Sequence, residues 1–389
     1  MKAEPQVRRR LPLTSFKGIM SMKRAILFLA FATALVHGAQ AQARNIILFI
    51  GDAGGIPTMN AASWYKYGQP QKLFIQSMPH IALMDTSAAD AYVTDSAAGM
   101  TAIVTGRKTN NGVISQSAAA RPGKRDGETL KTILEYAEEH GLSTGVLSNM
   151  NMTDATPAAC YAHVNDRDQS GKIFAQVFNP RFGDGVDLII GDGRDAMLAA
   201  ARKIGLDVES AMREKGYAFH GSLPDISDKD DRVIALMNTH DFPVEEAVGR
   251  AIQILSRNPK GYFLMAEWDT HTDELRRGLN QLIELDNVIR KTAQSVGDET
   301  LIIFAADHSF DLRLLRGKVG EPLLPGTESG GTGHVMRPNI VVGGGHTGEE
   351  VVVAARGPGA ERVHGFIANT DLFHIMMAAF GWDEPLTNQ

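Results

Sequence analysis

Apolar runs of strand length alternate with segments of helical periodicity along most of the chain. Unbroken apolar runs predict strands that are buried on both faces. They lie at residues 45–50, 143–147, 188–190, 233–237, 262–266, 301–305 and 339–342. Apolar residues at helical spacing predict helices over 128–140, 244–255, 274–296 and 371–380. This strand–helix order predicts an α/β fold with a mostly parallel sheet and helices on both faces.

The pattern offers no reason to divide residues 44–389 into two folding domains, because it contains neither an internal repeat nor a low-complexity linker. Residues 180–232 have the least regular pattern and are predicted to form an insertion or cap. Residues 317–345 are rich in Gly and Pro and are predicted to be mostly loop.

The first 43 residues have the pattern of a signal peptide. Basic residues precede the apolar run AILFLAFATALV at 25–36, and the small residues that follow offer cleavage after Ala41 or Ala43. The run is too short to cross a bilayer. We therefore expect export, either to the periplasm or by secretion, without a stable membrane anchor. Met20 or Met22 is an alternative start.

Charge and cysteine content narrow the function classes. The whole chain carries −6, and seven basic residues and one acidic residue lie within the first 43, so the rest carries −12. An acidic chain lacks the basic footprint that nucleic-acid binding requires. Cys160 is the only cysteine, which excludes an internal disulfide. Stability must rest on the apolar core, and any anionic substrate needs a local positive field.

Acidic and imidazole side chains follow three predicted strands. They are Asp52 after 45–50, Glu267, Asp269 and His271 after 262–266, and Asp307 and His308 after 301–305. In parallel sheets this carboxyl edge is where ligands bind, and carboxylate plus imidazole suits zinc. An Asp before glycines is by itself usually a turn residue, and an Asp-His pair alone is often a loop feature. The coincidence of three strands favours a metal site.

Residues 93–106, VTDSAAGMTAIVTG, predict a tightly packed helix that begins near Ser96. Unpaired N–H groups at a helix start favour a phosphate or oxyanion. Taken alone, Asp95-Ser96 before a helix is more simply an ordinary N-cap.

Five motifs, in this order, resemble those of the alkaline phosphatase family. They are NIILFIGDAGG, VTDSAAGMTAIVTGRKTNNGVIS, DATPAACYAHVNDR, TLIIFAADHS and GGHTGEEVVVAARGPGA, and they extend from residue 45 to 360. The resemblance implies a three-layer α/β/α sandwich and a phosphate monoester hydrolase that uses two zinc ions and one magnesium ion. It also implies small phosphate monoesters as substrates and, as in many relatives, a homodimer.

Carried over by position, the resemblance makes Ser96 the nucleophile that forms a phosphoseryl intermediate, supported by Asp95. Arg167 would grip two phosphate oxygens with its planar fork. Asp52, Asp307 and His308 would bind the zinc that activates the serine. His271, His346 and one acid of the 267–269 segment would bind the second zinc, which holds the hydrolysing hydroxide. Thr156 would bind magnesium with Asp52 and a glutamate, and Asp154 would lie just outside that site.

The segment Glu267-Trp268-Asp269-Thr270-His271 is shorter than its counterpart in the family. Either Glu267 binds magnesium and Asp269 binds zinc, or Glu267 takes the zinc position and leaves the third site short of an acid. The first assignment is favoured because Thr156 and Asp154 are both present. Asp273 is a weaker candidate.

The other histidines favour ordinary structural positions. His163, on a predicted helix between Thr156 and Arg167, favours a packed core residue. His220 and His240 have no acidic partner in the pattern. The KTNNG turn after the serine helix favours a tight loop over a binding site.

Two other functions compete with the monoesterase. A phosphodiesterase on the same scaffold is disfavoured by Arg167 and the magnesium residues, which suit a more highly charged phosphoryl group. A non-catalytic protein that binds phosphate or metal would be expected to lack the nucleophile or a zinc ligand.

Overall fold

The computed structural model describes residues 42–324 and 339–382. Its strands are β1 (Asn45–Asp52), β2 (His80–Asp85), β3 (Ser143–Asn151), β4 (Leu188–Asp192), β5 (Ala218–His220), β6 (Val233–Leu236), β7 (Tyr262–Asp269), β8 (Thr300–Ala305), β9 (Ser309–Leu314), β10 (Ile340–Thr347), β11 (Val351–Arg356) and β12 (Gly365–Ala368). Its helices are α2 (Ile56–Tyr67), α3 (Ser96–Thr105), α4 (Ile133–Glu139), α5 (Ala155–Tyr161), α6 (Ser170–Val177), α7 (Arg194–Lys203), α8 (Val208–Glu214), α9 (Val244–Leu255), α10 (Leu275–Ser295) and α11 (Asp371–Phe380).

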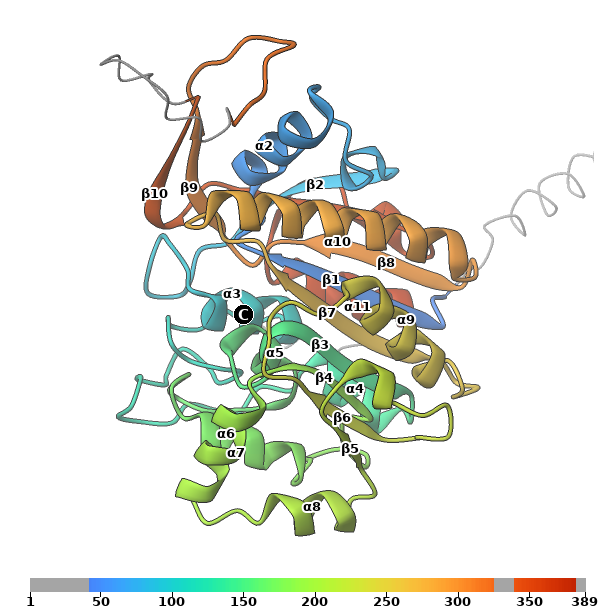
Figure 1. Cartoon of the computed structure of the whole chain (residues 1–389). Coiled ribbons are helices and arrows are strands. Elements are labelled where there is room, and N and C mark those ends of the chain that lie inside the picture. The colour runs from blue at the N-terminus through green and yellow to red at the C-terminus, as the bar shows by residue number, and fades with distance from the viewer. Residues whose placement is uncertain (1–41, 325–338, 383–389) are drawn as a thin grey trace, which may run out of the picture. The chain divides into compact units, whose positions relative to one another are not determined.

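Ten of the strands form one sheet in the order β12-β2-β11-β8-β1-β7-β3-β4-β6-β5, and β9 pairs with β10 in a separate hairpin. Within the described sheet only β11 runs antiparallel to its neighbours, β2 and β8. Figure 1 shows α10 lying across one face of the sheet, with β9 and β10 beyond one of its ends. The predicted mostly parallel α/β sheet is confirmed.

The central strand β1 builds a core on each side of the sheet. Ile46, Leu48 and Ile50 face a cluster that includes residues of α3, α4, α5 and α11. Ile47 and Phe49 face a second cluster with residues of α2, α9 and α10. All five side chains are fully buried. A strand covered by helices on both faces needs apolar residues at every position, which explains the unbroken run.

Several predicted elements have different bounds. The helix predicted over 128–140 begins at Ile133, because Thr132 forms a capping box in which its Oγ1 accepts from Glu135 N at 3.1 Å. The predicted strand 262–266 continues to Asp269, and the one at 339–342 becomes β10. The helix expected to contain His163 ends at Tyr161.

The segments with weak patterns hold short elements. Residues 180–232 contain β4 and β5 of the main sheet together with α7 and α8. Residues 1–41 of the predicted signal peptide and 325–338 of the predicted loop lie outside the described residues. In the described ranges, no helix combines the length and apolar composition that a bilayer crossing requires.

Candidate active site

Three adjacent strands bring the acidic residues to one edge of the sheet. The order β8-β1-β7 places the carboxyl ends of these strands side by side. Asp52 at the end of β1 is the register partner of Asp269 at the end of β7. Asp307 follows β8 after one intervening residue, and it is fully buried. Parallel strands that end together therefore produce the cluster expected from the sequence.

The carboxylates and imidazoles of the cluster lie within ion-pair distance of one another. His308 Nε2 lies 3.1 Å from Asp52 Oδ1 and 3.6 Å from Asp307 Oδ2. His271 Nδ1 lies 2.8 Å from Asp269 Oδ1 and 3.7 Å from Asp52 Oδ1. The rings of His308 and His346 stack, with centroids 3.6 Å apart. Two groups of residues each present ligand atoms within 4.8 Å of one another: His271, His308 and His346, and Asp52, Asp307 and His308.

Hydrogen bonds define which imidazole nitrogens face the cluster. His308 Nδ1 lies 3.1 Å from Ser309 O, and His346 Nδ1 lies 3.0 Å from Thr94 O. A carbonyl only accepts, so each Nδ1 carries a proton and donates. In a neutral ring, His308 Nε2 is then an acceptor that faces the acceptor Asp52 Oδ1. Two acceptors at this distance need either a second proton on the imidazole or a bound cation between them.

Buried carboxylate oxygens in the site lack hydrogen-bond donors. Asp52 Oδ1, Glu267 Oε2 and Asp307 Oδ2 are buried without a hydrogen-bond partner. Buried polar groups are normally paired, and an unpaired charged oxygen is costly. The donor set fits divalent cations, because carboxylate and imidazole are ligands of zinc and a carboxylate with a hydroxyl suits magnesium.

The ionisation of these groups reflects the crowding of negative charge. Burial, followed by the charge of Asp52, raises the pKa of Asp307 to about 6 and that of Glu267 well above its usual value. Burial would lower the pKa of His271, but the charge of Asp52 and the hydrogen bond to Asp269 outweigh it and raise the pKa to about 9. Burial would likewise raise the pKa of Asp52, but His271 and His308 hold it below its usual range. The cluster thus has more negative charge than its own imidazoles balance.

Ser96 is the first residue of α3 and opens onto this cluster. Its Oγ lies 3.3 Å from His308 Nε2, and the residue is 5% exposed. Asp95 caps the helix, with its Oδ1 accepting from Ala98 N at 3.0 Å. A Cβ on Gly99 would lie 2.7 Å from Asp307 O, so this glycine allows α3 to pack against the segment that carries Asp307 and His308. The helix start is thereby aimed at the acidic cluster.

Arg167 is held between two aspartates beside the serine. Its Nη1 lies 3.1 Å from Asp95 Oδ2, and its Nη2 lies 2.7 Å from Asp154 Oδ1. Burial would lower the pKa of the guanidinium, but the charges of Asp154 and Asp95 outweigh it and raise the pKa. Gly112 N also donates to Asp95 Oδ2, at 2.9 Å. The network keeps a permanently charged planar fork next to Asp95, the residue that precedes Ser96.

Comparison with known proteins decides the family. A sequence model of the family described as Alkaline phosphatase matches residues 43–220, 232–319 and 339–382. The chain belongs to the alkaline phosphatase family. It is accordingly an enzyme of the phosphate monoester hydrolase class, as the motifs predicted.

Individual relatives and solved structures support this family assignment. The tissue-nonspecific alkaline phosphatase of Felis catus is 29% identical over 440 residues, which cover 86% of this chain and 83% of the relative. The alkaline phosphatase of Gadus morhua is 30% identical and covers 69% of each chain. The enzyme of the Antarctic bacterium TAB5 has a TM-score of 0.73 at 22% identity, covering 89% of this chain and all of that one. At that identity the likeness shows the fold, and it confirms the predicted sandwich. A variant of the TAB5 enzyme has been solved with magnesium bound.

Thr156 and Glu267, the two residues assigned to the magnesium position, are both deeply buried. Each is 1% exposed, Thr156 on α5 and Glu267 near the end of β7. Asp154 caps α5. Ser148 hydrogen-bonds the Glu267 carboxyl, and the charges of Asp52, Asp154 and Asp307 all act on it. Glu267 therefore faces the Asp52 side of the cluster, whereas Asp269 bonds His271.

The sequence pattern did not predict several residues that contact the candidate site residues. Asn149 Oδ1 accepts from Asp269 N at 2.9 Å, and Phe310 packs edge-on against His271 at 5.2 Å. Asn111, in the turn interpreted as a plain loop, accepts from Asp95 N at 2.9 Å. The asparagines of KTNNG could have indicated this contact, because asparagine side chains in turns commonly hydrogen-bond to nearby backbone groups.

Two histidine interpretations need correction, and a third agrees with the structure. His220 pairs with Asp230 at 2.7 Å, and His240 pairs with Asp192 at 2.8 Å, so both have acidic partners. These partners come from other segments and leave no local pattern. His163 is buried as expected, and its Nε2 lies 3.0 Å from Glu135 Oε1.

Proposed function

We propose that this enzyme transfers the phosphoryl group of a monoester in line to Ser96 and then hydrolyses the phosphoseryl intermediate, releasing an alcohol and inorganic phosphate. One observation supports this above all. The Ser96 hydroxyl lies at a helix start, within hydrogen-bond reach of His308 and beside buried carboxylate oxygens that lack donors. A nucleophile in that position has both a phosphate-binding backbone and a site for cations next to it.

The described residues can be assigned to three cation positions. Asp52, Asp307 and His308 would hold one zinc ion, and Asp269, His271 and His346 the other. Magnesium would lie between Asp52, Glu267 and Thr156, a position supported by the donorless oxygen of Glu267 and by the magnesium in the TAB5 variant. When bound, the zinc ions supply Lewis acidity and lower the pKa of a coordinated hydroxyl or water.

The chain's own groups orient the substrate. The Arg167 fork offers two N–H donors to two nonbridging phosphate oxygens, while Asp95 and Asp154 fix its plane. The N–H groups at the start of α3 receive the same phosphoryl group that Ser96 attacks. A monoester dianion reacts through a loose transition state, so such charge placement provides most of the catalysis. Export through residues 1–43 and assembly into a homodimer stay predictions.

A comparison of substrates tests this function. We expect purified, zinc-loaded enzyme to turn over an aryl phosphate at least about a hundredfold better in kcat/KM than a bis-aryl phosphate, roughly 3 kcal/mol of discrimination. The reason is that Arg167 and the cations complement two negative charges rather than one. Equal rates would favour the phosphodiesterase, and phosphate binding without turnover of either ester would favour the non-catalytic protein.

Replacing Arg167 by lysine should lower kcat/KM for the aryl monoester by about 10- to 100-fold, because one ammonium cannot bind two oxygens in the plane of a fork. The loss in kcat/KM should be smaller for the diester than for the monoester, because the diester carries less negative charge. Arg181→Lys is the matched control, because Arg181 pairs with Glu135 instead of the site aspartates. Equal losses of kcat/KM in both variants would show that Arg167 does not bind the substrate.

A further inference from the structure

Asp269 differs from the other acidic residues of the site in its partners. Its Oδ1 accepts from His271 N at 3.0 Å and lies 2.8 Å from His271 Nδ1. Its Oδ2 faces Arg277 Nη2 at 3.4 Å. In the described part of the chain, Asp52, Glu267 and Asp307 form no ion pair with lysine or arginine. Asp269 alone among the four acids combines a candidate metal-ligand position with a permanent cation.

The backbone on both sides of this ion pair is tightly placed. Asp269 is the last residue of β7, and its N–H is bound by Asn149 at 2.9 Å. Arg277 lies in the first turn of α10, and the next residue, Gly278, packs against the 270–271 backbone. A Cβ on Gly278 would lie 2.1 Å from His271 O. This close approach fixes the base of the arginine side chain relative to Asp269 and His271.

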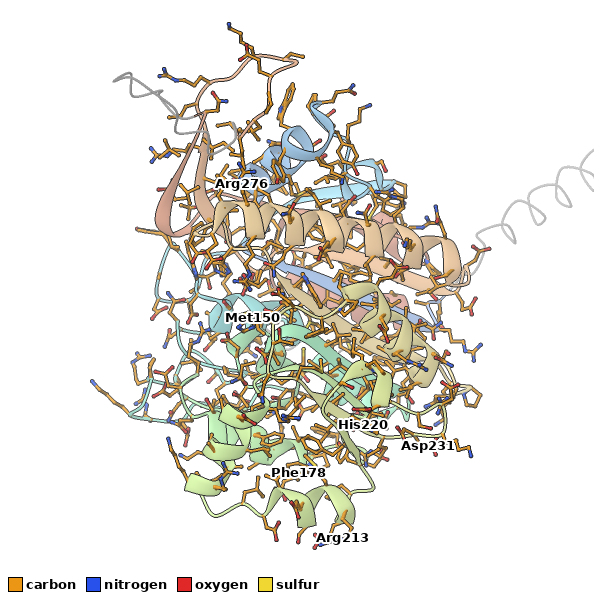
Figure 2. The ribbon with its side chains drawn as sticks, in the orientation of Figure 1. Met150, Phe178, Arg213, His220, Asp231 and Arg276 are labelled. Atoms are coloured by element: carbon orange, nitrogen blue, oxygen red, sulfur yellow. The ribbon has the colours of Figure 1, made fainter. Side chains whose placement is uncertain are left out.

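The two side chains differ in solvent access. The Asp269 side chain is 9% exposed, whereas that of Arg277 is 36% exposed and lines a groove of about 690 Å³ between the 240–245 segment and α10. Arg277 thus contacts the buried carboxylate from the solvent side of the site. Figure 2 labels its neighbour Arg276 at the end of α10 nearer β9 and β10. A guanidinium keeps its charge at any working pH, so the contact does not depend on titration of the arginine.

We propose that Arg277 is a positioning residue: it holds the Asp269 carboxylate, whose Oδ1 accepts from His271 Nδ1, in the orientation that the second zinc site with His271 and His346 requires. This inference rests on the proposed function. The segment between Glu267 and His271 is short, so Asp269 sits on a strand end with little freedom to adjust its backbone. Orientation of its carboxylate must come from side-chain partners. Outer partners of metal ligands typically change metal affinity or activity by 10- to 100-fold.

The test measures zinc binding without turnover. In a Ser96→Ala background, Arg277→Gln should lower the zinc affinity of one of the two sites by at least about tenfold and leave the affinity of the other unchanged. The measurement is competition with a chelator of known zinc affinity, followed by metal analysis. Arg277→Lys should recover part of the loss, because it restores the charge without the fork. With cobalt in place of zinc, the visible absorption of one site should change.

Lys291→Gln is the matched control. Lys291 lies on the same helix and lines the other end of the same groove, where it pairs with Glu245. Its loss removes the same charge about 21 Å further along the helix. Folding of each variant is checked by circular dichroism and thermal unfolding.

Two outcomes would overturn the inference and can be told apart. If Arg277→Gln binds zinc as tightly as Lys291→Gln and has an unchanged cobalt spectrum, Arg277 does not position Asp269 while the two-zinc function stands. If the parent with native Arg277 binds no zinc, the proposed function fails and the inference fails with it.

Discussion

Replacing Ser96 by alanine is expected to lower kcat/KM for an aryl phosphate monoester by at least about 10³, or roughly 4 kcal/mol. The hydroxyl at the start of α3 is the group placed to accept the phosphoryl group, 3.3 Å from His308 Nε2. Without it, phosphate can still bind to Arg167 and the cations, but transfer must occur directly to water. The measurement is steady-state turnover of purified, metal-loaded protein.

Covalent labelling separates loss of the nucleophile from loss of structure. Wild-type enzyme quenched in acid during turnover of labelled substrate should yield a phosphoserine peptide that contains residue 96, and Ser96→Ala should yield none. Ser77→Ala is the control, because Ser77 Oγ only bonds Phe74 O at 2.7 Å in an exposed turn. Retention of more than about a tenth of the activity by Ser96→Ala would show that another group attacks phosphorus.

Removing the metal ions should lower activity at least about a hundredfold, and zinc should restore it. The acidic cluster explains the size of this effect. Asp52 and Asp307 each have a buried oxygen without a donor. The chain beyond residue 43 has a net charge of −12. An apo site therefore repels a phosphate dianion instead of binding it.

The metal experiment is dialysis against a strong chelator, followed by assay and metal analysis. Zinc should restore activity, magnesium should increase it further through Glu267 and Thr156, and calcium alone should not restore it, because imidazole is a poor calcium ligand. The apo protein should also unfold at a lower temperature, since bound ions stabilise the native state. Full activity in protein shown to contain no zinc would contradict the two-zinc proposal.

Part of the site was predictable because its determinants are local. Unbroken apolar runs in the sequence predict β1, β7 and β8, and in each case the acidic residues lie at or just after the end of the strand. Since central parallel strands are covered on both faces, such runs are hard to mistake. The long helix α10 and the bounds of α9 and α11 were likewise recognisable from apolar spacing. Short edge strands such as β5 and β12 carry too few residues to show a period.

Other features depended on contacts between distant segments. His346 reaches the site by bonding Thr94, 252 positions away, and Arg167 reaches Asp95 across 72 positions. His240, in the segment after β6, pairs with Asp192 at the end of β4. No local periodicity encodes such pairs, because they follow from the order of strands in the sheet and from how closely the helices pack. Family motifs indicated the first two, while the third had no motif to indicate it.

By itself the sequence determined an α/β enzyme with a parallel sheet, an acidic carboxyl edge and the motifs of a phosphate monoester hydrolase, since burial on two faces and motif spacing are written along the chain. Only the tertiary structure decided which atoms meet: the close approach of His308 Nε2 to Asp52 Oδ1, the hydrogen bond from Asp95 N to Asn111, and the ion pair of Arg277 with Asp269. These contacts arise where separate elements pack together, and packing geometry is a property of the folded chain as a whole.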